Sequence, residues 1–100
     1  MNDLSFEDLQ KLAKLVKIDV DLNPEGVCVI KDAPEVIWDP LEKDDQCFMV
    51  LASLIKEKDC ELLYDDGYYF IYQFTDHEKE LLTYQSSLNE AIVKAVVDNG

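Results

Sequence analysis

The sequence predicts an α+β fold: a small, mostly antiparallel sheet with helices packed on its faces. Segments near both ends and in the middle of the chain repeat apolar residues at helical spacing. Between them, residues 68–74 are almost all aromatic or β-branched, which is typical of a strand. With 100 residues and 48% hydrophobic content, the chain can bury one core without disulfides or metals. We therefore predict a single domain over residues 1–100.

A first helix is predicted from the residues that follow Ser5. Ser5 suits the N-cap, and Asp8 stands three residues later, where a capping-box partner belongs. An apolar stripe then runs through Phe6, Leu9, Leu12, Ala13 and Val16. After a turn at 23–26, a short strand region is expected at 27–30 and again at 36–38.

The second helix has the clearest predicted start. Asp39 suits the N-cap, Pro40 the first helical position, and Glu42 the return bond of a capping box. Helical spacing then continues to about Glu57 through Leu41, Phe48, Leu51, Ala52, Leu54 and Ile55.

A three-stranded meander is predicted at 60–64, 68–74 and 79–85, with Gly67 in the first turn. Alternation places one set of aromatic residues on one face of the middle strand and Ile71 on the other. Neither face is polar, so both require cover. The tyrosines have two possible interpretations. Either they belong to a sheet that packs beneath its own helices, or they lie on a partly covered face that forms a homodimer. The tyrosines are Tyr64, Tyr68, Tyr69, Tyr72 and Tyr84.

A last helix is predicted after Ser87, which suits an N-cap, with Glu90 completing a second capping box. Its buried stripe is expected to contain Ala91, Ile92, Ala95 and Val96. Asn99 and Gly100 are residues that commonly end a helix.

Charge restricts the class of partner. The chain has 22 acidic residues against 9 basic ones, all lysine, for a formal net charge of -13. Phosphate backbones and anionic membranes would repel it, so we expect neither nucleic acid nor membrane as a direct partner. Basic proteins are favoured. The alternative is that the charge serves only solubility.

Compartment is predicted from cysteine usage and from the start of the chain. The three cysteines, Cys28, Cys47 and Cys60, have no CxxC spacing and are predicted to be buried, reduced thiols. Acidic residues stand where a signal peptide would be basic, and no apolar run approaches membrane-spanning length. We therefore expect a cytoplasmic protein.

One motif pair resembles a known group. The run Trp38-Asp39-Pro40-Leu41, with acidic residues and an apolar helix after it, and the closing run Ala91-Ile92-Val93-Lys94-Ala95 resemble small phage and prophage proteins of the phage α-β-α sandwich type. The resemblance covers the chain from Trp38 onward. It implies a fold and a phage or mobile-element origin in a bacterial host. It implies no catalytic set.

No reaction class is predicted. The segment 19–23 mimics the start of a calcium loop, but Pro24 and Ile30 replace the glycine and glutamate that such a loop needs. His77 is the only histidine and is expected in an exposed turn. The pairs Asp44-Asp45 and Asp65-Asp66 are explained by helix and turn chemistry. We therefore expect no enzyme, metal or cofactor.

The predicted function is a non-enzymatic, acidic protein-interaction module. Its most concrete form is an inhibitor that mimics DNA and binds a nucleic-acid-handling or defence protein of the host, as anti-CRISPR proteins do. The alternative is a structural or regulatory homodimer. The candidate partner-binding residues are Asp39, Glu42, Asp44, Asp45, Asp65, Asp66, Asp76, Glu78 and Glu80.

Overall fold

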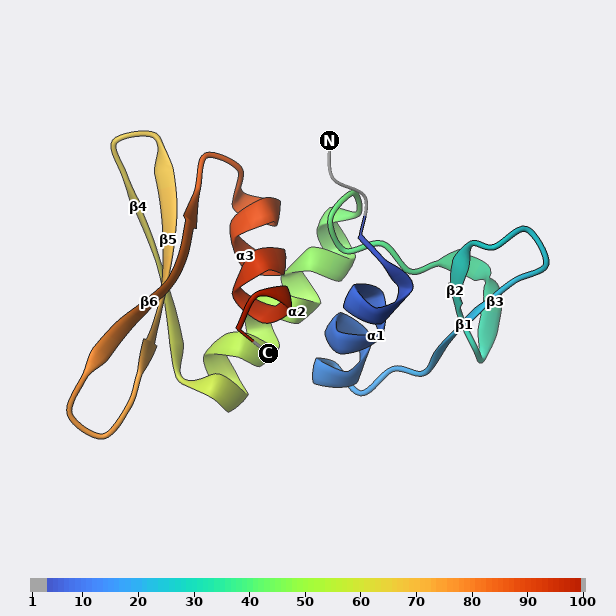
Figure 1. The fold of residues 1–100 in the computed structure, drawn as a ribbon, viewed down its shortest axis with the longest axis horizontal. Coiled ribbons are helices and arrows are strands. Elements are labelled where there is room, and N and C mark those ends of the chain that lie inside the picture. Colours follow the sequence, from blue (N-terminus) through green and yellow to red (C-terminus); the bar gives the residue numbers. More distant parts are fainter. Residues whose placement is uncertain (1–3, 100) are drawn as a thin grey trace.

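The computed structural model describes residues 4–99 and has two three-stranded antiparallel sheets on either side of three helices (Figure 1). The α+β class is confirmed. The N-terminal strand region forms a sheet of its own, with a strand at 20–22 that the sequence pattern did not predict. The elements are α1 (Phe6–Leu15), β1 (Val20–Leu22), β2 (Cys28–Ile30), β3 (Ala33–Ile37), α2 (Asp44–Lys58), β4 (Cys60–Asp65), β5 (Tyr68–Phe74), β6 (Lys79–Gln85) and α3 (Leu88–Val97).

The caps of α1 and α3 follow the sequence pattern. Ser5 Oγ accepts the Asp8 N–H at 3.1 Å, and Asp8 Oδ2 accepts the Ser5 N–H at 3.4 Å, so the first capping box is confirmed. Ser87 Oγ accepts the Glu90 N–H at 3.4 Å. Glu90 makes no return bond within residues 4–99, so only half of the second box forms. Gly100, expected to help end α3, lies outside the described residues.

The predicted start of α2 is wrong. The helix begins at Asp44. Its N-cap residue is Lys43, whose side chain makes no capping hydrogen bond. The Asp39 carbonyl instead accepts the N–H groups of Glu42 and Lys43 at 3.1 and 2.9 Å, which closes a tight turn around Pro40. The capping motif therefore builds a turn that precedes the helix.

Gln46 fixes this turn from inside the protein. Its Oε1 accepts the Asp39 N–H at 2.6 Å, and its Nε2 donates to the Ile37 carbonyl at 2.7 Å. Among the residues that the structure describes, Gln46 is the only polar one that is buried, and 4% of its surface is exposed. Two backbone groups between β3 and α2 are thereby paired away from water, as buried polar groups require.

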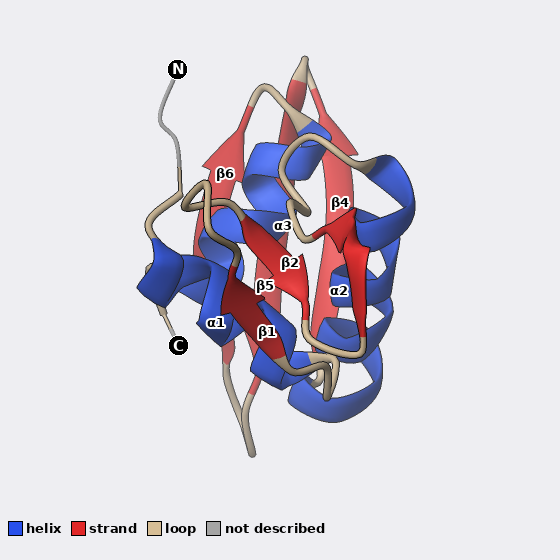
Figure 2. Ribbon diagram, turned by 90° about the vertical axis from the view of Figure 1, so that its right-hand side faces the viewer, coloured by secondary structure: helices blue, strands red, loops and turns tan. Residues whose placement is uncertain are grey.

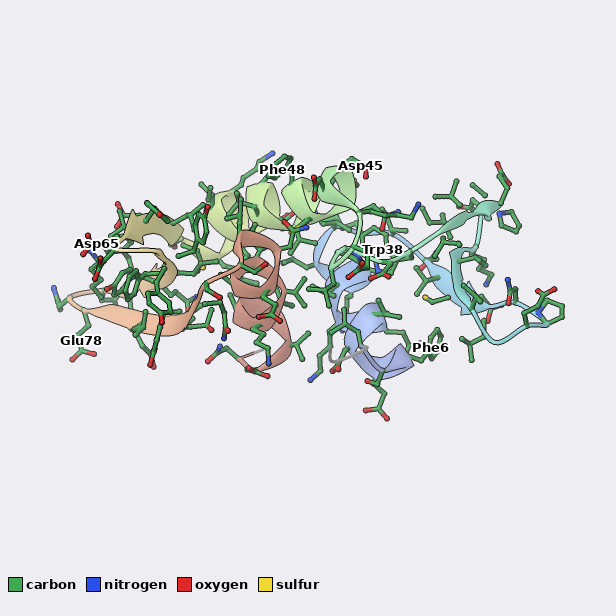
Figure 3. The ribbon with its side chains drawn as sticks, turned by 90° about the horizontal axis from the view of Figure 1, so that it is seen from above. Phe6, Trp38, Asp45, Phe48, Asp65 and Glu78 are labelled. Carbon is green, nitrogen blue, oxygen red and sulfur yellow. The ribbon has the colours of Figure 1, made fainter. Side chains whose placement is uncertain are left out.

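Trp38 joins the small sheet to the helices. Its indole Nε1 donates to the Leu9 carbonyl in α1 at 2.9 Å, and its backbone N–H donates to the Cys28 carbonyl in β2 at 3.0 Å. The side chain is 1% exposed. Figure 3 shows Trp38 between α1 and the small sheet.

Helix α3 lies at the centre of the fold. It packs on β5 and β6 of the meander and also contacts α1 and α2. Its buried residues therefore face several neighbours, and they combine two alanines with larger branched side chains. They are Ala91, Ile92, Val93, Ala95 and Val96.

The meander has the three predicted strands, and β4 extends one residue further than predicted, to Asp65. Asp66 and Gly67 have φ angles of 50° and 85°, the two-residue geometry that matches the twist of antiparallel strands. Ile71, Tyr69 and Leu62 point toward the helices and belong to the core. Seen from the small-sheet end, the meander lies behind the helices (Figure 2). The helices therefore cover one face of the meander, although its composition predicted cover on both.

Gln46→Leu should destabilise the protein by about 2 kcal/mol, because the Asp39 N–H and the Ile37 carbonyl would stay buried without partners. Asp39→Ala is the control. Its side chain makes no cap, so its effect should stay within about 0.5 kcal/mol. Urea denaturation measures both. Equal losses for the two variants would contradict the role given to Gln46.

Candidate protein-interaction surface

The outward face of the meander carries aromatic and aliphatic side chains that no helix covers. Tyr84 is 57% exposed, Tyr68 45%, and Phe74 44%. Strand alternation explains the arrangement. Ile71 and Tyr69 point toward the core, so the residues next to them in β5 must point away from it. We call this surface the aromatic face. It comprises Leu63, Tyr68, Phe70, Tyr72, Phe74, Leu81 and Tyr84.

The rings of the aromatic face contact one another across strands. Phe70 and Tyr84 stack with centroids 5.8 Å apart, and Tyr68 meets Tyr84 edge-on at 5.9 Å. Phe70 also stacks on Tyr72 at 6.3 Å. These distances lie in the range in which aromatic pairs attract. The rings therefore form one connected row that is fixed by the sheet.

A cation already lies on one end of this row. Lys79 Nζ is 4.4 Å from the centroid of Tyr72 and 5.7 Å from that of Phe74, within the range of cation–π attraction. The same ammonium lies 3.5 Å from Glu61 Oε1. At the other end, next to β6, the rings of Tyr68 and Tyr84 border an open hollow of about 540 Å³.

Carboxylates stand at both ends of the aromatic face. Asp65 and Asp66 form the β4–β5 tip, while Asp76 and Glu78 lie in the β5–β6 turn at the opposite end of the meander (Figure 1). Glu80 follows at the start of β6. At the rise of an extended strand the two ends are roughly 20 Å apart or more. Each of these side chains is exposed.

The remaining candidate carboxylates lie at the start of α2. Asp45 and Glu42 are exposed, and Asp39 is half-buried. Asp44 Oδ1 accepts a hydrogen bond from Asn89 Nδ2 at 2.9 Å, which ties α2 to α3. Figure 3 shows Asp45 well apart from Asp65. The nine predicted residues therefore lie in three separate groups, two of which belong to the meander.

The lysines neutralise few of these charges. Within residues 4–99 the ion pairs are Lys17–Glu57 and Lys79–Glu61. Neither includes any of the nine candidate carboxylates. The negative charge at the three groups is therefore not compensated by direct contact with a lysine of the same chain.

A hollow that no sequence motif indicates lies at the β5–β6 turn end of the meander. It has a volume of about 670 Å³, and its lining includes the exposed side chains of Ile55 and Phe74 and the carboxylates of Asp59 and Asp76. Asp59 ends α2 with a left-handed φ of 54°. The helical pattern placed Phe48 and Ile55 with the other apolar residues of α2, but both are about half exposed.

The calcium-like segment forms a short strand and a turn. Residues 20–22 form β1, and Asn23 Oδ1 accepts the N–H groups of Glu25 and Val27 at 3.0 and 2.9 Å in the turn before β2. In the described part of the chain, no three histidine, cysteine or acidic residues are grouped as metal ligands would be. His77 is exposed in the β5–β6 turn.

The three thiols are free and buried, as predicted. Burial, helped by the charge of Asp44, raises the pKa of the Cys47 thiol from its ordinary 9.0 to about 12. Burial and nearby aspartates also raise the pKa of Cys28 and Cys60. A raised pKa keeps a thiol protonated and therefore a poor nucleophile at neutral pH.

Comparisons with known proteins identify no relative: no protein family, curated protein or solved structure matches the chain. Among residues 4–99, no helix combines the length and the apolar content that crossing a membrane would require.

Stability should fall as pH rises above 9, and Cys47 should account for part of the loss. An unfolded Cys47 ionises near 9.0 and the folded one near 12. In that interval the unfolded state binds fewer protons, so rising pH favours unfolding. From pH 8 to pH 10 this contributes about 1 kcal/mol. Urea denaturation of the wild type and of Cys47→Ala at pH 8 and at pH 10 isolates the contribution of Cys47. If the two proteins lost the same free energy of unfolding between these pH values, the raised pKa of Cys47 would be contradicted.

Proposed function

We propose that this protein is a non-enzymatic, acidic protein-interaction module that binds a basic, nucleic-acid-handling protein. The single observation that carries the proposal is the set of carboxylates at both ends of the meander and at the start of α2, none of which is paired with a lysine among the described residues. Their field is available to a partner of opposite charge.

The sharpest form of the proposal is a DNA mimic that occupies a nucleic-acid-binding groove. A groove that binds a phosphate backbone is lined by lysine and arginine and gains affinity by neutralising regularly placed charges. A rigid sheet with carboxylates at its two ends presents such charges at fixed separation. A phage or mobile-element origin, which the motifs at residues 38–41 and 91–95 imply by resemblance, would suit such an inhibitor.

A homodimer is the second candidate, favoured by the uncovered aromatic face. Burying its exposed rings and leucines against a second copy would remove apolar surface from water. In that case the acidity would serve only to keep the protein dissolved. Sedimentation velocity over a range of protein concentrations distinguishes a dimer from a monomer.

Sodium chloride should stabilise the free protein. Screening weakens the mutual repulsion of a chain with net charge -13, so the urea midpoint should rise between low and physiological ionic strength. The gain should be smaller for Asp65→Asn/Asp66→Asn, which carries less charge. A midpoint that falls with salt would show that attractive pairs dominate the folded state.

Partner binding should respond to salt in the opposite direction. We expect the immobilised protein to capture basic proteins from a bacterial lysate at low salt, and duplex DNA to release them. Asp44→Asn/Asp45→Asn and Asp65→Asn/Asp66→Asn should each weaken the recovered complex several-fold.

The matched control is Asp32→Asn/Glu35→Gln, which removes the same charge from exposed positions of the small sheet. It should weaken binding less than the two test variants. A complex that is indifferent to salt, to duplex DNA and to all three variants would exclude an acidic mimic.

A further inference from the structure

We propose that the aromatic face is the docking surface and that the basic partner places arginine side chains over the rings of Tyr68 and Tyr84. The inference rests on the proposed function and adds to it the position of the contact and the chemistry of the contacting residue. It commits to one occupant, a protein surface that carries arginine.

The aromatic face already holds a cation of its own chain. Lys79 lies over Tyr72 and Phe74, 4.4 and 5.7 Å from their centroids. The rings already pack against one another across the sheet, so a cation that binds above them costs less side-chain entropy than it would on isolated rings. Tyr68 and Tyr84 belong to the same row of rings and are more than two-fifths exposed. A guanidinium stacks on such rings better than an ammonium, because it is planar and more weakly hydrated.

The charges along the sheet are complementary to those of a basic partner. Asp65 and Asp66 stand at the Tyr68 end of the face, and Asp76 stands beyond Phe74 at the other end. A basic partner that covers the rings therefore meets carboxylates at both ends. The apolar centre excludes water, and this strengthens the electrostatic contacts around it.

The same arrangement disfavours a second copy. Two sheets that pack face to face with aligned strands place their ends over each other. Because both ends of this meander are acidic, parallel and antiparallel alignment would each bring carboxylates against carboxylates. Each copy also carries a net charge of -13. An arginine-bearing partner satisfies the rings and the carboxylates together, whereas a second copy satisfies only the rings.

The test compares an oligo-arginine and an oligo-lysine peptide of equal length by calorimetry. Attraction by charge alone treats them alike, whereas ring stacking favours arginine. The wild-type protein should bind the arginine peptide more tightly, by a ratio on the order of threefold. Tyr68→Leu/Tyr84→Leu should bring that ratio close to one, while keeping the apolar character of the strands.

Two controls separate the ring from other effects. Tyr68→Phe/Tyr84→Phe keeps both rings and should keep the preference for arginine. Tyr64→Leu removes a ring that is 64% exposed but lies on the opposite face of the meander. There its centroid is 4.9 Å from the centroid of the Tyr69 ring. It should leave the preference unchanged. In NMR spectra of the wild type, the ring signals of Tyr68 and Tyr84 should move more than that of Tyr64 on adding the arginine peptide.

Equal affinity for the two peptides, or a preference that survives Tyr68→Leu/Tyr84→Leu, would overturn the docking surface. A peptide-free dimer that dissociates in Tyr68→Leu/Tyr84→Leu would also overturn it, in favour of a second copy. Failure of the proposed function has a different signature: neither peptide would bind, or both would bind without any dependence on salt.

Discussion

The junction formed by Trp38 and Gln46 holds the parts of this fold together. The small sheet, α1 and α2 come from separate segments, and these two side chains supply the polar contacts between them. Trp38 connects α1 to β2 through its indole and its backbone, and Gln46 pairs the backbone on either side of it. Because these groups are shielded from water, each bond lost would leave an unpaired partner inside the protein. The small sheet is therefore fixed by hydrogen-bond geometry as well as by apolar contact.

The position of the aromatic face follows from how the helices are distributed. Helix α3 is enclosed by the meander, α1 and α2, and its buried residues pack against them. With all three helices between the two sheets, none is left to cover the outer face of the meander. An uncovered row of rings in a chain of this size is typical of an interaction site. Its tyrosines suit that role, because the ring is apolar and the hydroxyl tolerates water.

Charge and apolar surface are combined on the meander. The turns at its two ends have to be polar, and here aspartate and glutamate supply the polarity. The strands between them alternate, so half of their aromatic side chains must face outward once Ile71 faces the core. Under the proposed function, this combination favours a basic partner over nucleic acid or a second copy, because the carboxylates repel both of the latter.

The sequence alone determined the features that depend on near neighbours. These are the Ser5 capping box, the Ser87 cap, the turn at Gly67 and the alternation of the long strand. Each is decided by residues a few positions apart, where local hydrogen bonds and side-chain period leave little choice. The acidic character of the chain also follows directly from its composition.

Only the tertiary structure decided the start of α2, the second sheet and the exposure of the aromatic face. Asp39 has the residue type of a cap, but Gln46 pairs its N–H and the chain turns before the helix begins. Phe48 and Ile55 have helical spacing but are exposed. The residues of α2 that its contacts with α1 and α3 bury are instead Cys47, Val50 and Leu54. Which of two apolar faces is covered depends on where distant helices pack, and no local pattern encodes that choice.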